Sequence, residues 1–247
     1  MTSVSVYRSV SILIPAYNEV ATLEEIVVRV VAAPLDPDGR LAKEIVIVDD
    51  GSRDGTAGSI ARSVDRFGSP DCTIRAAAHD RNRGKGAALK TALALATGDI
   101  VIVQDADLEY DPGDYQALLK PILDGSARVV YGTRWPNLHR QRRLPGHWRF
   151  LAGSWVVTRA ANVLFRARLS DVPTGYKVFT ADVIRAMSLR SDGFDVCCEL
   201  TAKARKAGYQ ITEVPISYRP RSVADGKKIR ATDGVRALAR LIRERIV

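Results

Sequence analysis

The 247-residue chain has few of the residues that build covalent or metal-based frameworks. It contains three cysteines, of which Cys197 and Cys198 are adjacent, so a disulfide framework and the CxxC spacing of a zinc site are both excluded. The three histidines, His79, His139 and His147, are scattered and form no HExxH-like cluster. We therefore interpret the cysteines as small buried hydrophobic residues in a reducing compartment.

The sequence also lacks a long hydrophobic run. No apolar stretch approaches the roughly 18 residues that a membrane-spanning helix needs, and residues 1–7 have neither the charged nor the apolar region of a signal peptide. We expect no membrane span and no secretory signal. The mean hydropathy of −0.07, with 26% charged and 46% hydrophobic residues, is typical of a soluble globular protein.

Acidic residues are absent from one long stretch of the chain. Residues 134–168 contain eight arginines and no Asp or Glu, and residues 219–247 contain nine basic and three acidic residues. Residues 1–133 have the opposite balance, with 14 basic and 19 acidic residues. The net charge of +9 is therefore confined to two segments, which indicates an anionic partner that meets one face of the molecule.

Short β-rich runs alternate with helical patterns through the first half of the chain. Residues 10–15 (VSILIP) and 44–48 (EIVIV) are almost continuously apolar, and residues 21–33 between them carry apolar side chains at helical spacing. We expect further strands at 73–78, 99–104 and 128–131, and further helices from about residue 54, at 86–96 and at 115–123. This alternation predicts an α/β sandwich with a mostly parallel central sheet.

Acidic residues follow three of the expected strands at the point where each strand ends. Glu19 follows the first strand, Asp50 the second, and Asp105 and Asp107 the fourth. In a parallel sheet these ends share one edge, where α/β proteins bind ligands. Carboxylates gathered there repel one another unless a cation lies between them. The pattern predicts a Mg²⁺ or Mn²⁺ site at Asp105 and Asp107. Glu109 continues the same spacing of two residues.

The glycine-rich segment 82–86 (NRGKG) satisfies neither common nucleotide-binding motif. It does not have the Walker A spacing, and Leu89 stands where the dinucleotide fingerprint needs Gly or Ala. A P-loop NTPase and a typical NAD enzyme are therefore not indicated. Two glycines and Lys85 at the start of a helix still predict a helix N-terminus that faces an anion.

These segments, in this order and spacing, resemble the GT-A glycosyltransferases of family 2. The similarity rests on residues 15–19 (PAYNE), 49–52 (DDGS), 82–86 (NRGKG) and 105–107 (DAD), and continues through 132–134 (GTR), 171–176 (DVPTGY) and 213–216 (EVPI). Within the family the chain is most similar to the dolichol-phosphate mannose synthase type of polyprenyl-phosphate glycosyltransferase. The resemblance implies a GT-A α/β/α sandwich and a hexosyltransferase with a nucleotide-sugar donor.

The resemblance also implies roles for residues on the donor side. The candidates for binding the nucleotide sugar are Pro15, Tyr17, Glu19, Asp50, Arg81, Lys85 and Asp105. Glu19 falls on the ribose position and Asp50 on the base or ribose position, whereas Arg81 and Lys85 fall near the donor phosphates. The candidates for the metal are Asp105, Asp107 and Glu109, with Asp107 also a catalytic candidate, and the expected cofactor is Mg²⁺ or Mn²⁺.

The acceptor side is expected to be basic. An acceptor phosphate is already an anion, so it needs no general base, only cations that bring it to the donor. The candidates are Arg134, Arg149 and Lys227, although residues 225–228 (DGKK) lack the serine of the Gly-x-Ser-Lys motif that relatives often have. Direct attack in one step predicts inversion at the anomeric carbon. A hydroxyl acceptor would need a carboxylate base, for which Asp195 is the candidate, with a helix N-cap as its structural alternative.

Three classes of function stay open on the sequence alone. The first is transfer to a polyprenyl phosphate at an anionic membrane surface, with a homodimer or a membrane-spanning partner also open. The second is transfer to a soluble hydroxyl acceptor, or nucleotidyl transfer, although a nucleotidyltransferase usually has a Gly-rich loop where this chain has residues 15–17. The third is nucleic-acid binding by the basic segments, which no RNP, HTH or zinc-finger pattern accompanies. We expect the first, with no nucleic acid as partner.

The C-terminal residues predict a basic amphipathic helix. We expect residues 1–231 to form a single GT-A catalytic domain and residues 232–247 to form this helix. Val235, Leu238, Leu241, Ile242 and Ile246 are expected on one side, and Arg236, Arg240 and Arg243 largely on another. Such a helix is either an interfacial membrane anchor or a helix packed on the sheet with its arginines in solvent. In both cases we expect a cytoplasmic protein, peripheral at the inner face of the membrane.

Overall fold

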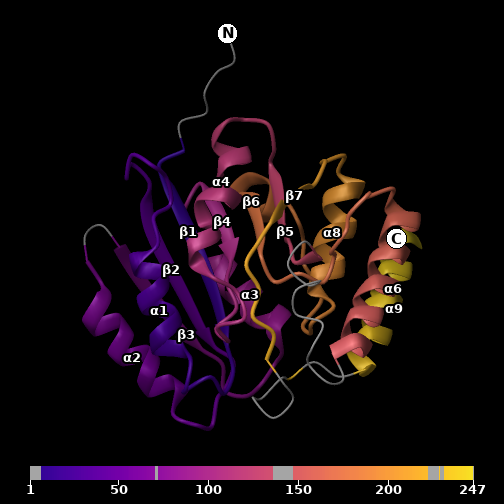
Figure 1. Cartoon of the computed structure of the whole chain (residues 1–247). Coiled ribbons are helices and arrows are strands. Elements are labelled where there is room, and N and C mark those ends of the chain that lie inside the picture. Colours follow the sequence, from indigo (N-terminus) through magenta and orange to yellow (C-terminus); the bar gives the residue numbers. More distant parts are fainter. Residues whose placement is uncertain (1–6, 70–71, 136–146, 222–227, 229–230, 247) are drawn as a thin grey trace.

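The computed structural model describes residues 7–69, 72–135, 147–221, 228 and 231–246 (Figure 1). The described residues form one seven-stranded sheet in the order β3-β2-β1-β4-β6-β5-β7. Its strands are β1 (Ser9–Ala16), β2 (Ala42–Asp49), β3 (Cys72–Ala78), β4 (Ile100–Val103), β5 (Val129–Thr133), β6 (Lys177–Thr180) and β7 (Thr212–Pro215). Only β6 runs antiparallel to its neighbours in this described sheet, so the predicted mostly parallel sheet is confirmed.

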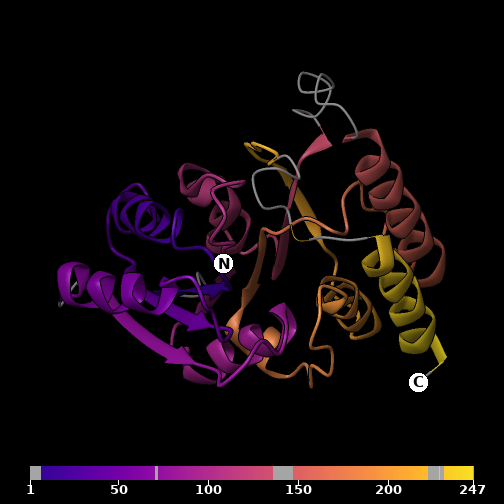
Figure 2. The ribbon, with the colours of Figure 1, turned by 90° about the horizontal axis from the view of Figure 1, so that it is seen from below.

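Helices join the strands and cover both faces of the sheet (Figures 1 and 2). They are α1 (Leu23–Ala32), α2 (Thr56–Phe67), α3 (Lys85–Leu95), the short η1 (Pro112–Asp114), α4 (Tyr115–Leu123), α6 (His147–Phe165), α7 (Ala181–Arg185), α8 (Val196–Lys206) and α9 (Ala231–Ile246). The helices predicted from periodicity in the first half of the chain are confirmed. Their ends lie within about two residues of the predicted ones, which is the usual uncertainty of helix boundaries.

Side-chain alternation along the strands divides the core into two layers. Ile12 and Ile14 of β1 pack with α1 and α4 on one face of the sheet. Leu13 points to the other face and packs with residues of α3, α6 and α8. Because both faces are buried, the strands are apolar at successive positions rather than at every second one.

The strand register brings the predicted acidic loops to one edge. Ala16 of β1 lies opposite Asp49 of β2, and Asp49 lies opposite Ala78 of β3. On the other side of β1, Leu13 pairs with Val103, the last residue of β4. The segments that begin at Tyr17, Asp50 and Gln104 therefore leave the sheet beside one another, at the carboxyl ends of parallel strands.

The C-terminal helix α9 packs mainly against the helices α6 and α8. Leu241 is buried, but Val235, Ile242 and Ile246 of the predicted apolar side are 68%, 54% and 79% exposed. Arg240, predicted for the solvent side, is turned inward because its guanidinium meets Asp195 at 2.9 Å. The division into a domain ending at residue 231 and a terminal helix stays a prediction. No helix among the described residues is both long and apolar enough to cross a bilayer.

If α9 is an integral part of the fold, its two adjacent apolar residues must respond differently to truncation. Leu241→Ala empties a fully buried site and is expected to lower the free energy of unfolding by about 2–5 kcal/mol. Ile242→Ala, at a position that is 54% exposed, is expected to change it by less than about 1 kcal/mol. Urea denaturation followed by circular dichroism measures both, and equal effects of the two substitutions would contradict the observed packing.

Candidate active site

The glycine-rich loop after β3 is held by the carboxylate of Asp50. This side chain is 3% exposed, and its Oδ2 accepts a hydrogen bond from the backbone N–H of Gly84 at 2.7 Å. Its Oδ1 accepts from the N–H of Arg83 at 2.9 Å and lies 2.7 Å from Nδ1 of His79. Three neighbours thus occupy the carboxylate that the resemblance assigned to the base or ribose, so in this structure Asp50 orders the loop that precedes α3.

Close backbone packing fixes the start of α3. Gly84 has a φ of 102° and lies against the backbone of Asp192, where any added Cβ would overlap the Asp192 carbonyl oxygen. Such a conformation is strained for other L-residues, which explains the glycine. The next residue, Lys85, extends from this fixed point to form an ion pair with Asp105 at the end of β4. The pair is largely buried, with side chains 20% and 17% exposed.

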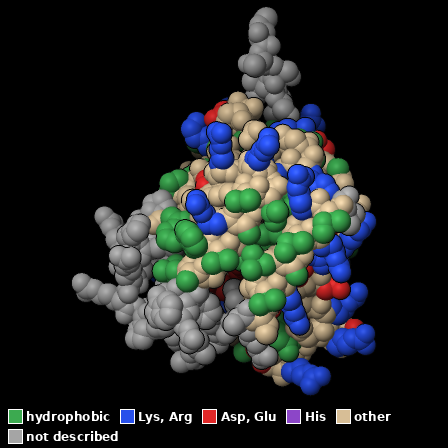
Figure 3. Space-filling view, turned by 90° about the vertical axis from the view of Figure 1, so that its right-hand side faces the viewer, with side chains coloured by type: hydrophobic (Ala, Val, Ile, Leu, Met, Phe, Trp, Pro, Cys, Tyr) green, Lys and Arg blue, Asp and Glu red, His purple; other side chains and the backbone are tan. Residues whose placement is uncertain are grey.

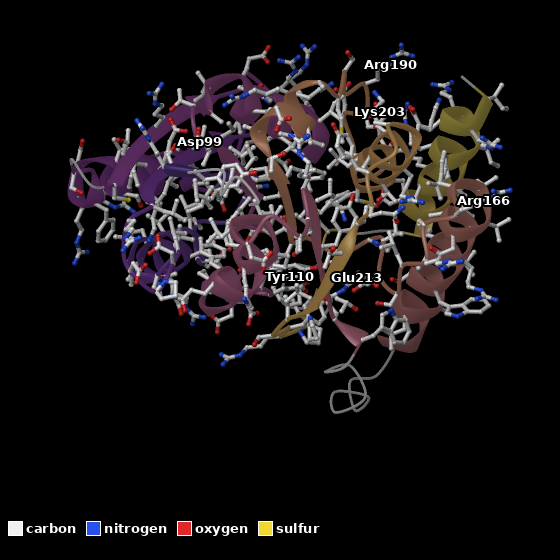
Figure 4. The ribbon with its side chains drawn as sticks, turned by 90° about the horizontal axis from the view of Figure 1, so that it is seen from above. Asp99, Tyr110, Arg166, Arg190, Lys203 and Glu213 are labelled. Carbon is white, nitrogen blue, oxygen red and sulfur yellow. The ribbon has the colours of Figure 1, made fainter. Side chains whose placement is uncertain are left out.

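Asp105 is confined from its other side by Gly175. A Cβ atom at position 175 would overlap the Oδ2 atom of Asp105 and lie 2.6 Å from the ring of Tyr110. The N–H of Gly175 donates a 2.8 Å hydrogen bond to the Tyr110 hydroxyl, and Tyr110 packs against Tyr176 and Tyr218. Tyr110 is labelled in Figure 4. The backbone at residue 175 thus leaves just enough space for the first aspartate of the Asp-Ala-Asp segment.

The second aspartate, Asp107, faces a cation from the far end of the chain. Its Oδ2 accepts a hydrogen bond from Nη2 of Arg221 at 2.9 Å. The same guanidinium lies 3.2 and 3.3 Å from the two carboxylate oxygens of Glu19, which follows β1. Lys228 donates to Glu19 as well, at 2.6 Å, and also to the backbone carbonyl of Tyr17. Glu19 and Asp107 are therefore joined by one shared cation, Arg221, and Glu19 has a second cation, Lys228, of its own.

Glu109 faces the segment that follows β7. Its Oε1 accepts a 2.7 Å hydrogen bond from the backbone N–H of Arg221, and its Oε2 accepts a 2.9 Å bond from the Tyr218 hydroxyl. The side chain is 8% exposed. In this structure Glu109 anchors the segment that carries Arg221 to the acidic edge of the sheet.

The predicted set of three metal ligands is not assembled. Among the residues that the structure describes, no three Asp, Glu, His or Cys side chains converge as a metal site, and Glu109 is turned to its own partners. Asp105 and Asp107 nevertheless fit a divalent cation. Burial, together with the negative charges of Asp105 and Glu109, raises the pKa of Asp107 to about 7. Two hard oxygen donors in mutual repulsion are what Mg²⁺ or Mn²⁺ would relieve, so these two residues would hold the ion.

Arg134 forms a further ion pair, with Asp171, beside this edge. Its Nε and Nη2 each donate a 2.7 Å hydrogen bond to Asp171, and its backbone N–H donates a third bond at 3.1 Å. Burial opposes ionisation of Asp171, but Arg134 outweighs it and lowers the pKa of the carboxyl group. Glu213, labelled in Figure 4 on β7, fixes the loop by accepting from the N–H of Asp171 at 3.0 Å.

One network of contacts connects Arg134 with Asp107. The guanidinium of Arg134 lies over the ring of Tyr218, 5.1 Å from its centroid. The hydroxyl of Tyr218 binds Glu109, whose other oxygen binds the N–H of Arg221, and Arg221 binds Asp107. The predicted phosphate-binding arginine and the predicted metal-binding aspartates therefore belong to one site.

Other candidates lie elsewhere or outside the described residues. The guanidinium of Arg81 is 79% exposed and lies 3.8 Å from Asp80, so the structure does not bring it to Lys85. Asp195 occupies the N-cap position of α8 without a capping bond, and it accepts hydrogen bonds from Ser191 and Arg240 instead. Arg149 belongs to α6, but its side chain lies outside the described residues, as does Lys227. Pro15 is the last residue but one of β1, and Tyr17 directly follows that strand.

Sequence reasoning gave no role to several residues that build the site. Arg221 and Lys228 come from the basic C-terminal segment, whose charge excess was the available signal, but the sequence cannot pair them with Glu19, which lies 202 positions from Arg221. Asp171 and Gly175 stand in the segment DVPTGY that carried part of the resemblance. In the structure this segment positions two site residues, because Asp171 pairs with Arg134 and Gly175 packs against Asp105.

Known proteins resemble the chain over most of its length. The family model described as Glycosyl transferase family 2 matches residues 11–188. Glycosyltransferase AglD of Haloferax volcanii is 29% identical over 224 residues, which cover 86% of this chain and 33% of AglD. UDP-N-acetylglucosamine–dolichyl-phosphate N-acetylglucosaminyltransferase of Methanococcus voltae is 27% identical, over 90% of this chain and 91% of that protein. The chain thus spans about a third of the first relative and nearly all of the second.

Solved structures share the architecture. Glucosyl-3-phosphoglycerate synthase from Mycobacterium tuberculosis, in complex with Mn²⁺, uridine diphosphate and phosphoglyceric acid, superposes with a TM-score of 0.70. The match covers 96% of this chain and 78% of that one at 22% sequence identity. At this identity the likeness establishes the fold, and the predicted GT-A α/β/α sandwich is confirmed.

The buried pair Arg134–Asp171 is expected to contribute strongly to stability. Asp171→Asn leaves Arg134 without its counter-charge and is expected to cost about 3–5 kcal/mol at pH 7. Because the pKa of Asp171 is lowered by folding, its contribution is present above the unfolded pKa of about 4 and is lost as pH falls through the folded value. The difference between variant and wild type should therefore shrink in acid.

Urea denaturation at several pH values tests this expectation. The control is Asp182→Asn, which removes the partner of Arg128 in a pair whose side chains are 62% and 47% exposed and is expected to cost less than about 1 kcal/mol. A penalty for Asp171→Asn no larger than that of the control would contradict the assigned pair.

Proposed function

Because the chain belongs to glycosyl transferase family 2, we propose that it moves a hexose from a nucleotide sugar to the phosphate of a polyprenyl phosphate. The family resemblance predicted from the motifs is confirmed, and the chain is a glycosyltransferase. The proposed donor is of the GDP-mannose or UDP-glucose type. The proposed location is the cytoplasmic face of a membrane, where the acceptor is embedded and the enzyme is peripheral.

The observation that carries the proposal is the alternation of charges at the carboxyl edge of the sheet. Carboxylates from β1 and β4 meet cations from α3 and from the segment after β7, in the pairs Lys85–Asp105, Arg221–Asp107 and Lys228–Glu19. A bound diphosphate with its cation carries both signs of charge. Such a ligand can exchange partners with this network without leaving a buried charge unpaired.

The donor side is built from the first two loops of the sheet. We assign Tyr17 and Glu19 to the nucleoside, and Lys85 to the diphosphate, because Lys85 projects from the N-terminus of α3 toward Asp105. A divalent cation on Asp105 and Asp107 would neutralise the charge that develops on the leaving nucleoside diphosphate. The Mn²⁺ and uridine diphosphate in the M. tuberculosis synthase support this assignment.

The acceptor side centres on Arg134. Its side chain is 15% exposed and is held rigid by two bonds to Asp171, so it can present its remaining N–H groups to an anion in a fixed direction. A phosphate nucleophile needs such cations and no general base. Attack on the anomeric carbon in a single step inverts its configuration. The dolichyl phosphate in the name of the M. voltae relative supports a lipid phosphate as acceptor.

Transfer to a soluble hydroxyl acceptor is less well supported. That reaction needs a carboxylate base, and the candidate Asp195 is engaged by Arg240 at 2.9 Å and by Ser191 at 2.9 Å. A base must be accessible to the proton that it abstracts, whereas the side chain of Asp195 is 13% exposed. Family membership also favours glycosyl transfer over nucleic-acid binding as the use of the basic segments.

The proposal predicts that Asp107→Ala abolishes transfer. Loss of a carboxylate ligand should lower donor-dependent turnover by at least about 100-fold, because the developing diphosphate charge is then left without its cation. Release of nucleoside diphosphate is measured with GDP-mannose, UDP-glucose and UDP-GlcNAc in turn, with and without a short polyprenyl phosphate, and with EDTA.

Asp111→Asn is the matched control. Asp111 stands four positions further along and caps η1 by accepting a hydrogen bond from the N–H of Gly113. Asparagine keeps a side-chain oxygen that accepts the capping bond, so the substitution removes only the charge and should leave turnover within about threefold of wild type. The metal assignment fails if Asp107→Ala keeps turnover within that same range. The acceptor assignment fails if turnover does not depend on polyprenyl phosphate.

A further inference from the structure

Helices α6 and α9 lie side by side at one edge of the molecule and share an outer face (Figures 1 and 2). On α9 the exposed residues Val235, Ala239, Ile242 and Ile246 follow one another at spacings of four, three and four, and so form a single stripe. Beside it, α6 exposes Trp155, Val156 and Val163, of which Val163 is 80% accessible. We call these seven residues the α6–α9 face.

The exposed charged side chains of the described parts of α6 and α9 all have one sign. The sequence of α6 contains no Asp or Glu. The two acids of α9, Asp233 and Glu244, are turned inward, with side chains 16% and 9% exposed. The exposed basic residues on and next to the two helices are Arg159, Arg166, Arg168, Arg236, Arg243 and Arg245. Figure 3 shows hydrophobic side chains across the middle of this face, Lys and Arg side chains around them, and a few Asp and Glu side chains toward the margin of the view.

Exposure of the apolar side chains of the α6–α9 face to water is unfavourable. The six large apolar side chains Trp155, Val156, Val163, Val235, Ile242 and Ile246 are between 44% and 80% exposed, and a contiguous patch of that kind marks an interaction surface. The guanidinium of Arg159 lies 5.6 Å from the ring centroid of Trp155, an amphipathic pair suited to an interface between water and lipid headgroups.

We propose that the α6–α9 face docks on an anionic lipid surface. Its apolar stripe enters the boundary between headgroups and acyl chains, and its arginines bind lipid phosphates. The role of this docking surface rests on the proposed function, because an enzyme that uses a lipid-linked acceptor must reach the membrane in which the acceptor is embedded. It extends the predicted C-terminal anchor to two helices, and it uses the side of α9 that the packing leaves exposed.

Helix α6 connects this surface to the acceptor side of the site. Its inner side faces the loop that holds Arg134, because the Thr158 hydroxyl accepts a 3.1 Å hydrogen bond from the N–H of Val172, and Ser154 donates one to Asp171 at 3.4 Å. A membrane bound to the outer side of α6 therefore lies one helix thickness, about 10 Å, from that loop. A lipid phosphate could reach Arg134 while its chain stays in the bilayer.

A second copy of the chain fits the face less well than lipid does. A two-fold contact would place the same patch of both copies together, so that arginine would meet arginine. The described part of α6 and α9 offers no exposed carboxylate to balance them. Lipid phosphates supply that negative charge, which is why we assign the face to a membrane.

Vesicle sedimentation tests the surface directly. The full chain is mixed, without any nucleotide sugar, with vesicles of phosphatidylcholine alone or with about 30% phosphatidylglycerol. We expect binding to the anionic vesicles only. The triple variant Val163→Ser, Ile242→Ser, Ile246→Ser should lower the partition coefficient at least about tenfold through lost apolar burial. Each of Arg159→Gln and Arg243→Gln should lower it about fivefold, less at high salt.

Matched controls separate the face from general surface chemistry. Val28→Ser removes a valine that is 44% exposed on α1, and Arg40→Gln removes an arginine whose side chain is 83% exposed, both far from α9 in the fold. Both should bind vesicles as the wild type does. Because all substituted residues are exposed, thermal melting should be unchanged. Wild-type binding with full retention in the triple variant would overturn the proposal.

Two further readouts decide the remaining outcomes. Absence of vesicle binding, together with a concentration-dependent dimer in analytical ultracentrifugation that the triple variant abolishes, would overturn the proposal in favour of an interface between copies. Transfer to a short, water-soluble polyprenyl phosphate is measured separately and should be equal in wild type and triple variant. If that transfer fails while vesicle binding follows the predicted pattern, the proposed function is wrong and the docking surface stands.

Discussion

Electrostatic repulsion among carboxylates at the ends of parallel strands is the constraint around which this molecule is organised. The register of β1, β2 and β4 brings Glu19, Asp50 and Asp107 to one edge, where full or partial burial raises the free energy of each charged carboxylate. Asp50 is balanced by backbone N–H groups, and Glu19 and Asp107 by side chains from the C-terminal segment. An edge that already needs positive charge is suited to a cation and to the diphosphate that accompanies it.

Close backbone contacts give this edge its rigidity. Gly84, after β3, packs on the backbone of Asp192, between α7 and α8, and Gly175, after α6, packs on Asp105, after β4, so two pairs of loops are fixed by direct contact at a glycine. Such contacts position Lys85 and Asp105 before any ligand arrives, which would lower the reorganisation that the proposed transfer requires. The Arg134–Asp171 pair would perform the same task for the proposed acceptor side.

The parts that the sequence predicts are those in which local pattern and burial agree. Apolar runs such as residues 10–15 identify the strands, and the acids that follow them identify the edge. Arg240 shows why helix patterning alone fails: its inward position depends on Asp195, which belongs to another helix. Likewise the carboxylate oxygens of Asp50 accept hydrogen bonds from the N–H groups of residues 83 and 84. The sequence around Asp50 does not predict these bonds, because their donors lie more than 30 residues further along the chain.

The central claim is that Asp105 and Asp107 together bind a divalent cation that in turn binds a nucleoside diphosphate. Calorimetric titration of uridine or guanosine diphosphate into the protein, with Mn²⁺ and then with EDTA, measures this most directly. The account predicts binding that requires Mn²⁺ and that disappears in the variant Asp105→Asn, Asp107→Asn. Equal affinity for the diphosphate with and without the metal, or undiminished metal-dependent binding in that variant, would contradict it.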